Sequence, residues 1–269
     1  MNTIWLIASG TFGEAMRRKI LLVFLFVALA IMLMGVAFTS LAQARDLSVT
    51  KSLGLGVISL AGVFISIILY ITLIPQEIER RTIYSILSKP VQRYQFLCGK
   101  FLGGLMTVLS NVALMGVILI ILIAFKQHQY NQAVGPAVGA MAKGILMIFF
   151  QLTLLGAVAM FFSVFLSPFV NFFLTFAVFL LGSTTLLGDL ANPASDPGHP
   201  KNPIVTGIFQ VLHIAVPNFA NYNIQNPIIN PHEHIVNEPI YIAWNILYAI
   251  VYTAILLTIG TMIFDRREV

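Results

Sequence analysis

The chain has 269 residues, of which 58% are hydrophobic and 9% are charged, and its mean hydropathy is +0.92. This composition excludes an ordinary soluble domain and is typical of a chain embedded in lipid. The net charge of +5 is too modest to indicate a nucleic-acid surface, and the single cysteine, Cys98, excludes an internal disulfide framework.

The first residues, Thr3–Met16, carry apolar side chains near helical spacing. We expect segment 1–19 to be an interfacial helix along the inner leaflet. Its anchors would be Trp5, Arg17, Arg18 and Lys19. An alternative is a signal peptide that ends at Ala42-Gln43-Ala44, but the apolar run is longer than the roughly 7–15 residues of such peptides. We therefore favour a retained first span.

Six apolar runs are long enough to cross a hydrocarbon core, which takes roughly 20 residues. They are Ile20–Leu41, Leu53–Ile74, Phe101–Phe125, Gly144–Leu166, Phe169–Leu187 and Ile240–Phe264, and none contains Lys, Arg, Asp or Glu. Ion-driven carriers usually need carboxylates or unwound helices inside the membrane, so the runs argue against one. The polar residues within them are expected to form hydrogen bonds between helices. They are Ser110, Asn111, Gln151, Asn171 and Asn245.

The loop of residues 75–100, between the second and third runs, holds a dense cluster of charged residues. Pro75 is suited to the first position of a helix, and Glu77 and Glu79 follow in its first turns, where the helix dipole favours anions. Pro90 should end the helix near Ser88. Its apolar face would consist of Ile83, Ile86 and Leu87, and its charges include Arg80 and Arg81. The pattern predicts an amphipathic helix that docks on another protein; a solvated loop is the alternative.

The distribution of basic residues predicts that both termini face the cytoplasm. With the N-terminus inside, the inner segments hold ten basic residues, namely Arg17, Arg18, Lys19, Arg80, Arg81, Lys89, Arg93, Lys100, Arg266 and Arg267. The outer segments hold five, namely Arg45, Lys51, Lys126, Lys143 and Lys201. This asymmetry follows the positive-inside rule.

The longest stretch between runs, residues 188–239, is expected outside the cell. Within it, Ile204–Val216 is apolar but too short to span, which predicts a re-entrant or interfacial helix. His232, Glu233 and His234, with His213 or Glu238 as a third ligand, invite a metal hypothesis, although a loop without metal is favoured. The sequence has no phosphate-binding Gly-rich loop and no Gly-x-Ser-x-Gly motif, so we expect no catalytic centre and no ATP hydrolysis by this chain.

The inner-loop sequence ERRTIYSILSKPVQRYQFLCGKFLG resembles the signature of bacterial type-2 ABC exporter permeases. The overall pattern is closest to the branch that includes the copper-enzyme maturation permease. The matching positions are Glu79, Arg81, Thr82, Leu87, Ser88, Pro90, Arg93, Gly99 and Lys100 in the loop, Arg17 and Lys19 before the first span, Pro217-Asn218-Phe219 in the outer segment and Arg266-Arg267 at the tail.

The resemblance implies one all-α membrane domain over residues 1–269, with six transmembrane helices, an N-terminal interfacial helix, a cytoplasmic coupling helix and an outer re-entrant segment. It also implies a bacterial inner-membrane location, a separate cytoplasmic ATPase that binds the ATP, and a second permease copy, identical or related. The coupling helix would rest on that ATPase through residues between Glu77 and Lys100. The alternatives are a stand-alone carrier or channel, a membrane anchor for a soluble complex, and a membrane metalloenzyme.

Overall fold

The computed structural model describes residues 3–41, 47–79, 92–129, 134–184, 203–224 and 237–266, and all regular secondary structure in these ranges is helical. In chain order the helices are α1 (Thr3–Met16), α2 (Lys19–Leu41), α3 (Ser48–Leu73), α4 (Pro75–Glu79), α6 (Arg93–Gln129), α7 (Val134–Ser163), α8 (Pro168–Gly182), α10 (Pro203–Ala215), the short 3₁₀ helix η2 (Ala220–Tyr222) and α12 (Glu238–Arg266). The predicted all-α class is confirmed.

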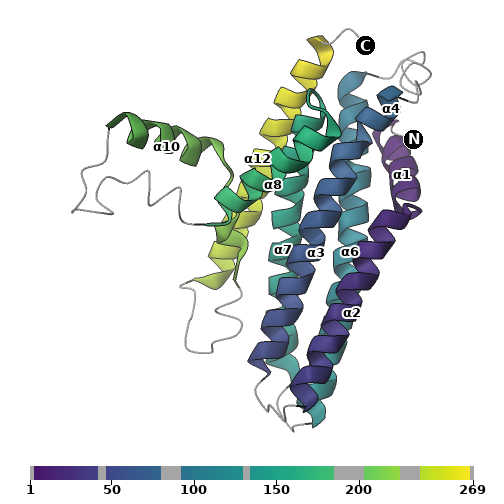
Figure 1. Ribbon diagram of the computed structural model, residues 1–269, viewed down its shortest axis with the longest axis vertical. Helices are drawn as coiled ribbons and strands as arrows, with labels where there is room; N and C mark the ends of the chain where they lie inside the picture. The colour runs from purple at the N-terminus through teal and green to yellow at the C-terminus, as the bar shows by residue number, and fades with distance from the viewer. Residues whose placement is uncertain are drawn as a thin grey trace.

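Five of the described helices, α2, α3, α6, α7 and α12, are long and apolar enough to cross a membrane. They correspond to five of the six predicted spans. Figure 1 shows α3, α6 and α7 side by side, with α2 and α12 on the two flanks. The helices α3 and α7 are the most buried, whereas α2 and α12 leave most of their apolar surface uncovered. The core therefore lies between α3, α6 and α7.

The core packs closely because glycines let a large side chain enter between helices. Tyr70 of α3 is fully buried, and its ring lies against Gly104 of α6 and Gly156 of α7. A side chain at either glycine would overlap the ring. The Tyr70 hydroxyl donates a hydrogen bond to the carbonyl oxygen of Phe101 at 3.2 Å. Small residues at contacts between membrane helices commonly allow such close approach.

The predicted span over Phe169–Leu187 corresponds to α8, which has only 15 residues. At 1.5 Å per residue, α8 is about 22 Å long, shorter than a hydrocarbon core of about 30 Å. Its last residue, Gly182, lies against the chain at Pro217, and its carbonyl oxygen accepts a hydrogen bond from the Phe219 amide at 2.7 Å. A full fifth crossing is therefore not supported by α8 alone.

The N-terminal helix is formed as predicted, and one of its faces packs onto α6. Ala8, Thr11 and Ala15 form this buried face. Gly99 and Gly103 of α6 lie against it, and a side chain at Gly103 would meet the carbonyl oxygen of Ala8. The helix is thus attached to the bundle by its small residues. Trp5 is 55% exposed, which leaves it free to act as the predicted membrane anchor.

The residues that enter the bundle from the predicted outer segment lie after α10. Figure 1 shows α10 projecting away from the other helices, and its Ile208 and Val211 side chains are exposed. In contrast, Phe219, Tyr222 and Ile224 are almost completely buried. The sequence predicted the apolar helix correctly but missed that the following residues, 217–224, are the ones that pack into the core.

Three tyrosines on one face of α12 hold this stretch in place. The hydroxyls of Tyr241 and Tyr252 donate to the carbonyl oxygens of Asn221 and Ala215, each at 2.7 Å. The Tyr248 hydroxyl accepts from the Asn218 amide at 3.3 Å. Their spacing of seven and four residues places all three on the same side of a helix.

We expect α10 to dip into the outer leaflet, because its exposed face is apolar. In a Cys98→Ala background, a cysteine at Ile208 or Leu212 should react slowly with a polar, membrane-impermeant thiol reagent, whereas one at Asp196 should react quickly. The measurement is the labelling rate in intact vesicles. Equal rates at the three positions would mean that α10 is an ordinary water-exposed helix.

The polar residues inside the spans did not behave as predicted, with one exception. The Asn171 side chain of α8 donates to the carbonyl oxygen of Ala159 in α7 at 2.9 Å, which is a bond between helices. Ser110 and Asn111 instead donate to carbonyl oxygens of their own helix, as does the Asn245 amide. Short polar side chains often take this local option because the carbonyl one turn back is always within reach.

Candidate functional site at the base of the charged loop

The two ends of the charged loop are joined by a buried ion pair. Lys100 in the third turn of α6 places its ammonium nitrogen 2.5 Å from a carboxylate oxygen of Glu77 in α4. The side chains are only 6% and 15% exposed. The Lys100 nitrogen also lies 5.8 Å from the centre of the Phe96 ring. Because the surroundings are largely shielded from water, the attraction between the two charges is stronger than in a surface ion pair, although desolvation offsets much of it.

The loop's C-terminal end is also attached to the last helix. Arg93, the first residue of α6, donates a hydrogen bond of 2.7 Å to the carbonyl oxygen of Phe264. Its guanidinium carbon lies 5.7 Å from the centre of the Phe264 ring. Phe264 is in the last turn of α12, where carbonyl oxygens have no partner within the helix and a cation is favoured. Arg93 therefore caps α12 while it starts α6.

On the N-terminal side of the loop, Arg18 links three helices. It lies between α1 and α2, and its guanidinium donates to the Thr72 hydroxyl at 2.6 Å, in the last turn of α3. The same guanidinium lies 3.4 Å from a carboxylate oxygen of Glu14 in α1. Arg17 and Lys19 on either side are exposed. The three contacts Glu77–Lys100, Arg93–Phe264 and Arg18–Thr72 are called the loop base below.

The structure brings some of the predicted coupling residues together. Pro75 begins α4 and Glu77 lies in its first turn, as predicted. Glu77, Arg93 and Lys100 each contact other residues of the chain, and their coupling to an ATPase stays a prediction. The other predicted coupling positions lie outside the described residues or, for Glu79, have no described side chain. They are Glu79, Arg80, Arg81, Thr82, Ile83, Ile86, Leu87, Ser88 and Pro90.

The loop base sits at one end of the bundle together with both described chain ends. Figure 1 shows α1, α4, the start of α6 and the end of α12 gathered there, opposite the end of α2 and the starts of α3 and α7. A cavity of about 540 Å³ opens beside it, with Glu14, Arg17, Arg18 and Lys19 among its lining residues. These contacts serve as mechanical attachment: Glu77–Lys100 joins the two ends of the loop, Arg93 ties the loop to α12, and Arg18 ties the end of α3 to the junction of α1 and α2.

The described residues contain no group of three His, Cys, Asp or Glu side chains placed to hold a metal ion. His232, Glu233 and His234 lie outside the described residues.

A bundle of long apolar helices, with a charged loop attached at one end, defines a multi-pass membrane protein. Residues 5–269 match the family model described as ABC-2 family transporter protein, so the chain belongs to that family and is a membrane component of an ABC transporter. Membrane subunits of this family lack the ATPase domain, in agreement with the absence of a phosphate-binding loop in the sequence. None of the curated proteins compared with the sequence gives a match.

Proposed function

We propose that this chain is the permease subunit of an exporter in a bacterial inner membrane, powered by a separate cytoplasmic ATPase. The ATPase would dock on the loop between Glu79 and Pro90. Family membership supports an ATPase partner in general. The observation that carries the coupling role is the buried Glu77–Lys100 pair, which fixes the two ends of this loop to each other.

The contacts of the loop base would let a force on the loop reach the whole bundle. Glu77 and Lys100 connect the loop to α4 and α6, Arg93 connects it to α12, and Arg18 connects the end of α3 to α1. When ATP binding moves the ATPase, these helices would move with the loop as one body. Two permease copies would then rock between inward-facing and outward-facing states, which is a rigid-body transition between two populated arrangements.

Purification from the native host tests this function. An ATPase with a Gly-x-x-x-x-Gly-Lys-Ser/Thr loop should co-purify with the tagged chain in mild detergent, and the complex should hydrolyse ATP. A chain that is isolated without an ATPase and moves ions down a gradient by itself would be a stand-alone carrier. A complex that hydrolyses ATP but moves no molecule across a vesicle membrane would be a membrane anchor.

The proposed orientation places the loop base in the cytoplasm. A reporter fused after Val269 should report the cytoplasm, and one inserted within Asn192–Lys201 should report the outside, because ten basic residues against five favour this arrangement. The activities of alkaline phosphatase and a fluorescent protein at each site provide the measurement. The reverse pattern at either site would overturn the orientation.

A further inference from the structure

A second cavity lies far from the loop base, in the middle of the bundle and toward its opposite end. Its volume is about 240 Å³, and it is bounded by α3, α7, the end of α8 and residues 219–224. Its polar lining side chains are Ser59, Gln151, Ser183, Tyr222 and Asn223, and none of the described residues that line it is charged. The cavity is slightly smaller than sites for drug-sized ligands, which occupy roughly 300–1,000 Å³, so it suits a single ring or headgroup.

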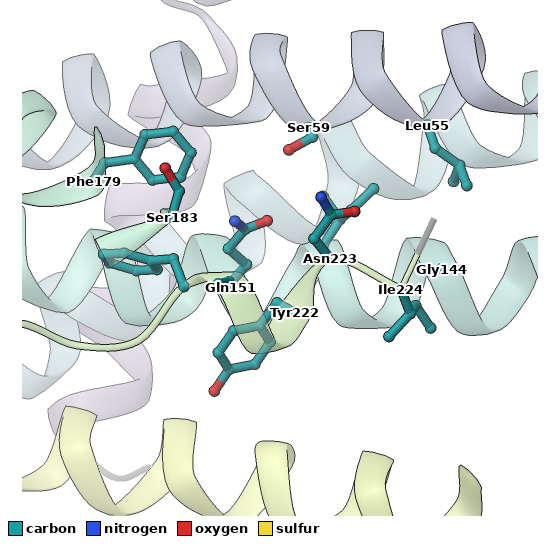
Figure 2. A pocket seen from close by; sticks show the side chains of 12 residues that line it. Leu55, Ser59, Gly144, Gln151, Phe179, Ser183, Tyr222, Asn223 and Ile224 are labelled. Carbon is teal, nitrogen blue, oxygen red and sulfur yellow. The ribbon is translucent and has the colours of Figure 1, made fainter. Parts of the chain in front are cut away.

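Gln151 is the side chain that points to a ligand. It comes from the middle of α7 and is only 6% exposed. Figure 2 shows its amide directed into the space below Ser59, beside the Asn223 amide. Among the described residues no hydrogen-bond partner is found for the Gln151 side chain or for the Ser59 hydroxyl. The Gln151 amide borders the cavity and is available to a bound group, which sets it apart from Asn171, Asn111 and Asn245, whose amides are all bonded.

The remaining walls are fixed, so that the cavity keeps its shape. Tyr222 turns its hydroxyl away from the cavity to donate to the Asn245 carbonyl oxygen at 2.8 Å, as Figure 2 shows by its direction toward α12. Burial and the neighbouring Tyr248 and Tyr241 raise the pKa of Tyr222 above its ordinary value, so this residue stays neutral. The Ser183 hydroxyl donates to Leu180 in its own helix. The free hydrogen-bonding capacity therefore belongs to α3 and α7.

We propose that this cavity binds a neutral group rich in hydroxyls or amides, such as a sugar ring, on the molecule that the permease exports. That the bound group belongs to exported cargo rests on the proposed transport function. Because the described lining residues carry no charge, they offer an anionic or cationic headgroup no counter-charge to offset its desolvation. A hydroxylated neutral group can instead donate to the Gln151 amide oxygen and accept from its nitrogen and from Ser59.

The test uses three probes that share an octyl chain and differ in headgroup: octyl-β-D-glucoside, octyl phosphate and octyltrimethylammonium. Ser183→Cys in a Cys98→Ala background, in lipid nanodiscs, serves as the reporter. The rate at which N-ethylmaleimide labels this cysteine is measured with each probe below its micelle concentration. The concentration that halves the labelling rate should be about tenfold lower for the glucoside than for either charged probe, because two neutral hydrogen bonds contribute roughly that factor in affinity.

Gln151→Leu is the decisive variant, and it separates a binding role from a structural one. It should remove the protection by the glucoside while leaving the thermal midpoint of the protein unchanged or higher, because it breaks no hydrogen bond to a described residue and adds an apolar side chain to a buried position. Ser59→Ala should weaken protection by a smaller factor. Asn171→Leu is the structural control: it should lower the thermal midpoint, because it removes the bond to Ala159.

Equal protection by all three probes, no protection by any, or glucoside protection that survives both Gln151→Leu and Ser59→Ala would each overturn the proposal. The assay needs no ATPase. It can therefore fail while an ATPase co-purifies, or succeed when none does, so that the two hypotheses are judged separately.

Discussion

Replacement of Lys100 by methionine is expected to destabilise the protein by up to about 3–5 kcal/mol, because it removes the ammonium group that lies against the buried Glu77 carboxylate. The reason is the asymmetry of buried ion pairs. The pair itself adds little compared with a well-packed apolar pair, but removing one charge takes away attraction that had offset the desolvation of the other. Both side chains are at least 85% buried, so solvent screens them weakly. The free energy of unfolding in a mild detergent, measured from the Lys100→Met variant against the parent, gives the value.

Two controls make this experiment specific. The pair Lys143–Glu238 at the other end of the bundle has a similar nitrogen–oxygen distance of 2.8 Å, but its side chains are 46% and 38% exposed. Lys143→Met should therefore cost less than about 1 kcal/mol. The double variant Glu77→Met with Lys100→Met should regain most of the lost stability, and the difference between the single and double variants measures the coupling of the pair. If Lys100→Met and Lys143→Met cost the same, the buried pair has no special role in stability.

The double variant also bears on function. If it folds as well as the parent yet uncouples ATP hydrolysis from transport, then the pair serves to transmit force. Full transport by the double variant would place the connection elsewhere in the loop base, at Arg93 or Arg18.

The long helices could be predicted because their apolar runs are long and uncharged, so that length alone identifies them. The end of α8 could not be predicted in this way. The apolar run continues to Leu187 in the sequence, but the helix ends at Gly182, where the chain at Pro217 and Phe219 packs against it. A contact between positions that are 35 or more residues apart leaves no periodic signal in either segment. The burial of residues 217–224 was missed for the same reason.

The loop base was only partly predictable. The sequence identified Glu77, Arg93 and Lys100 by their charge, but their partners depend on how α4, α6 and α12 meet in three dimensions. Gln151 was noted as a polar residue within a span, and the usual expectation for such residues is a bond to another helix. Only the structure shows that it has none. In contrast, the tyrosines at positions 241, 248 and 252 share a helical face that the sequence alone could have revealed.

Reversal of Arg81 to glutamate is expected to release the ATPase. Arg81 belongs to the charge-dense segment between α4 and α6, in a chain in which only 9% of residues are charged. The described residues that flank this segment, Glu77 and Arg93, belong to the loop base. Arginine next to apolar anchors, here Ile83, Ile86 and Leu87, is typical of the residues that dominate binding energy at interfaces.

The loss of one such residue costs on the order of 2 kcal/mol or more, which corresponds to roughly thirtyfold weaker binding. The Arg81→Glu variant should therefore recover much less ATPase on purification and should stop transport, while its amount in the membrane equals that of the parent. Charge reversal at Lys201, in the predicted outer segment, adds the same charge change at a position that an ATPase in the cytoplasm cannot reach, and it should affect neither measurement. Full ATPase recovery and transport with Arg81→Glu would exclude this residue from the docking surface. Loss of the ATPase with Lys201→Glu as well would instead indicate a general effect of net charge, because the two positions are expected to lie on opposite sides of the membrane.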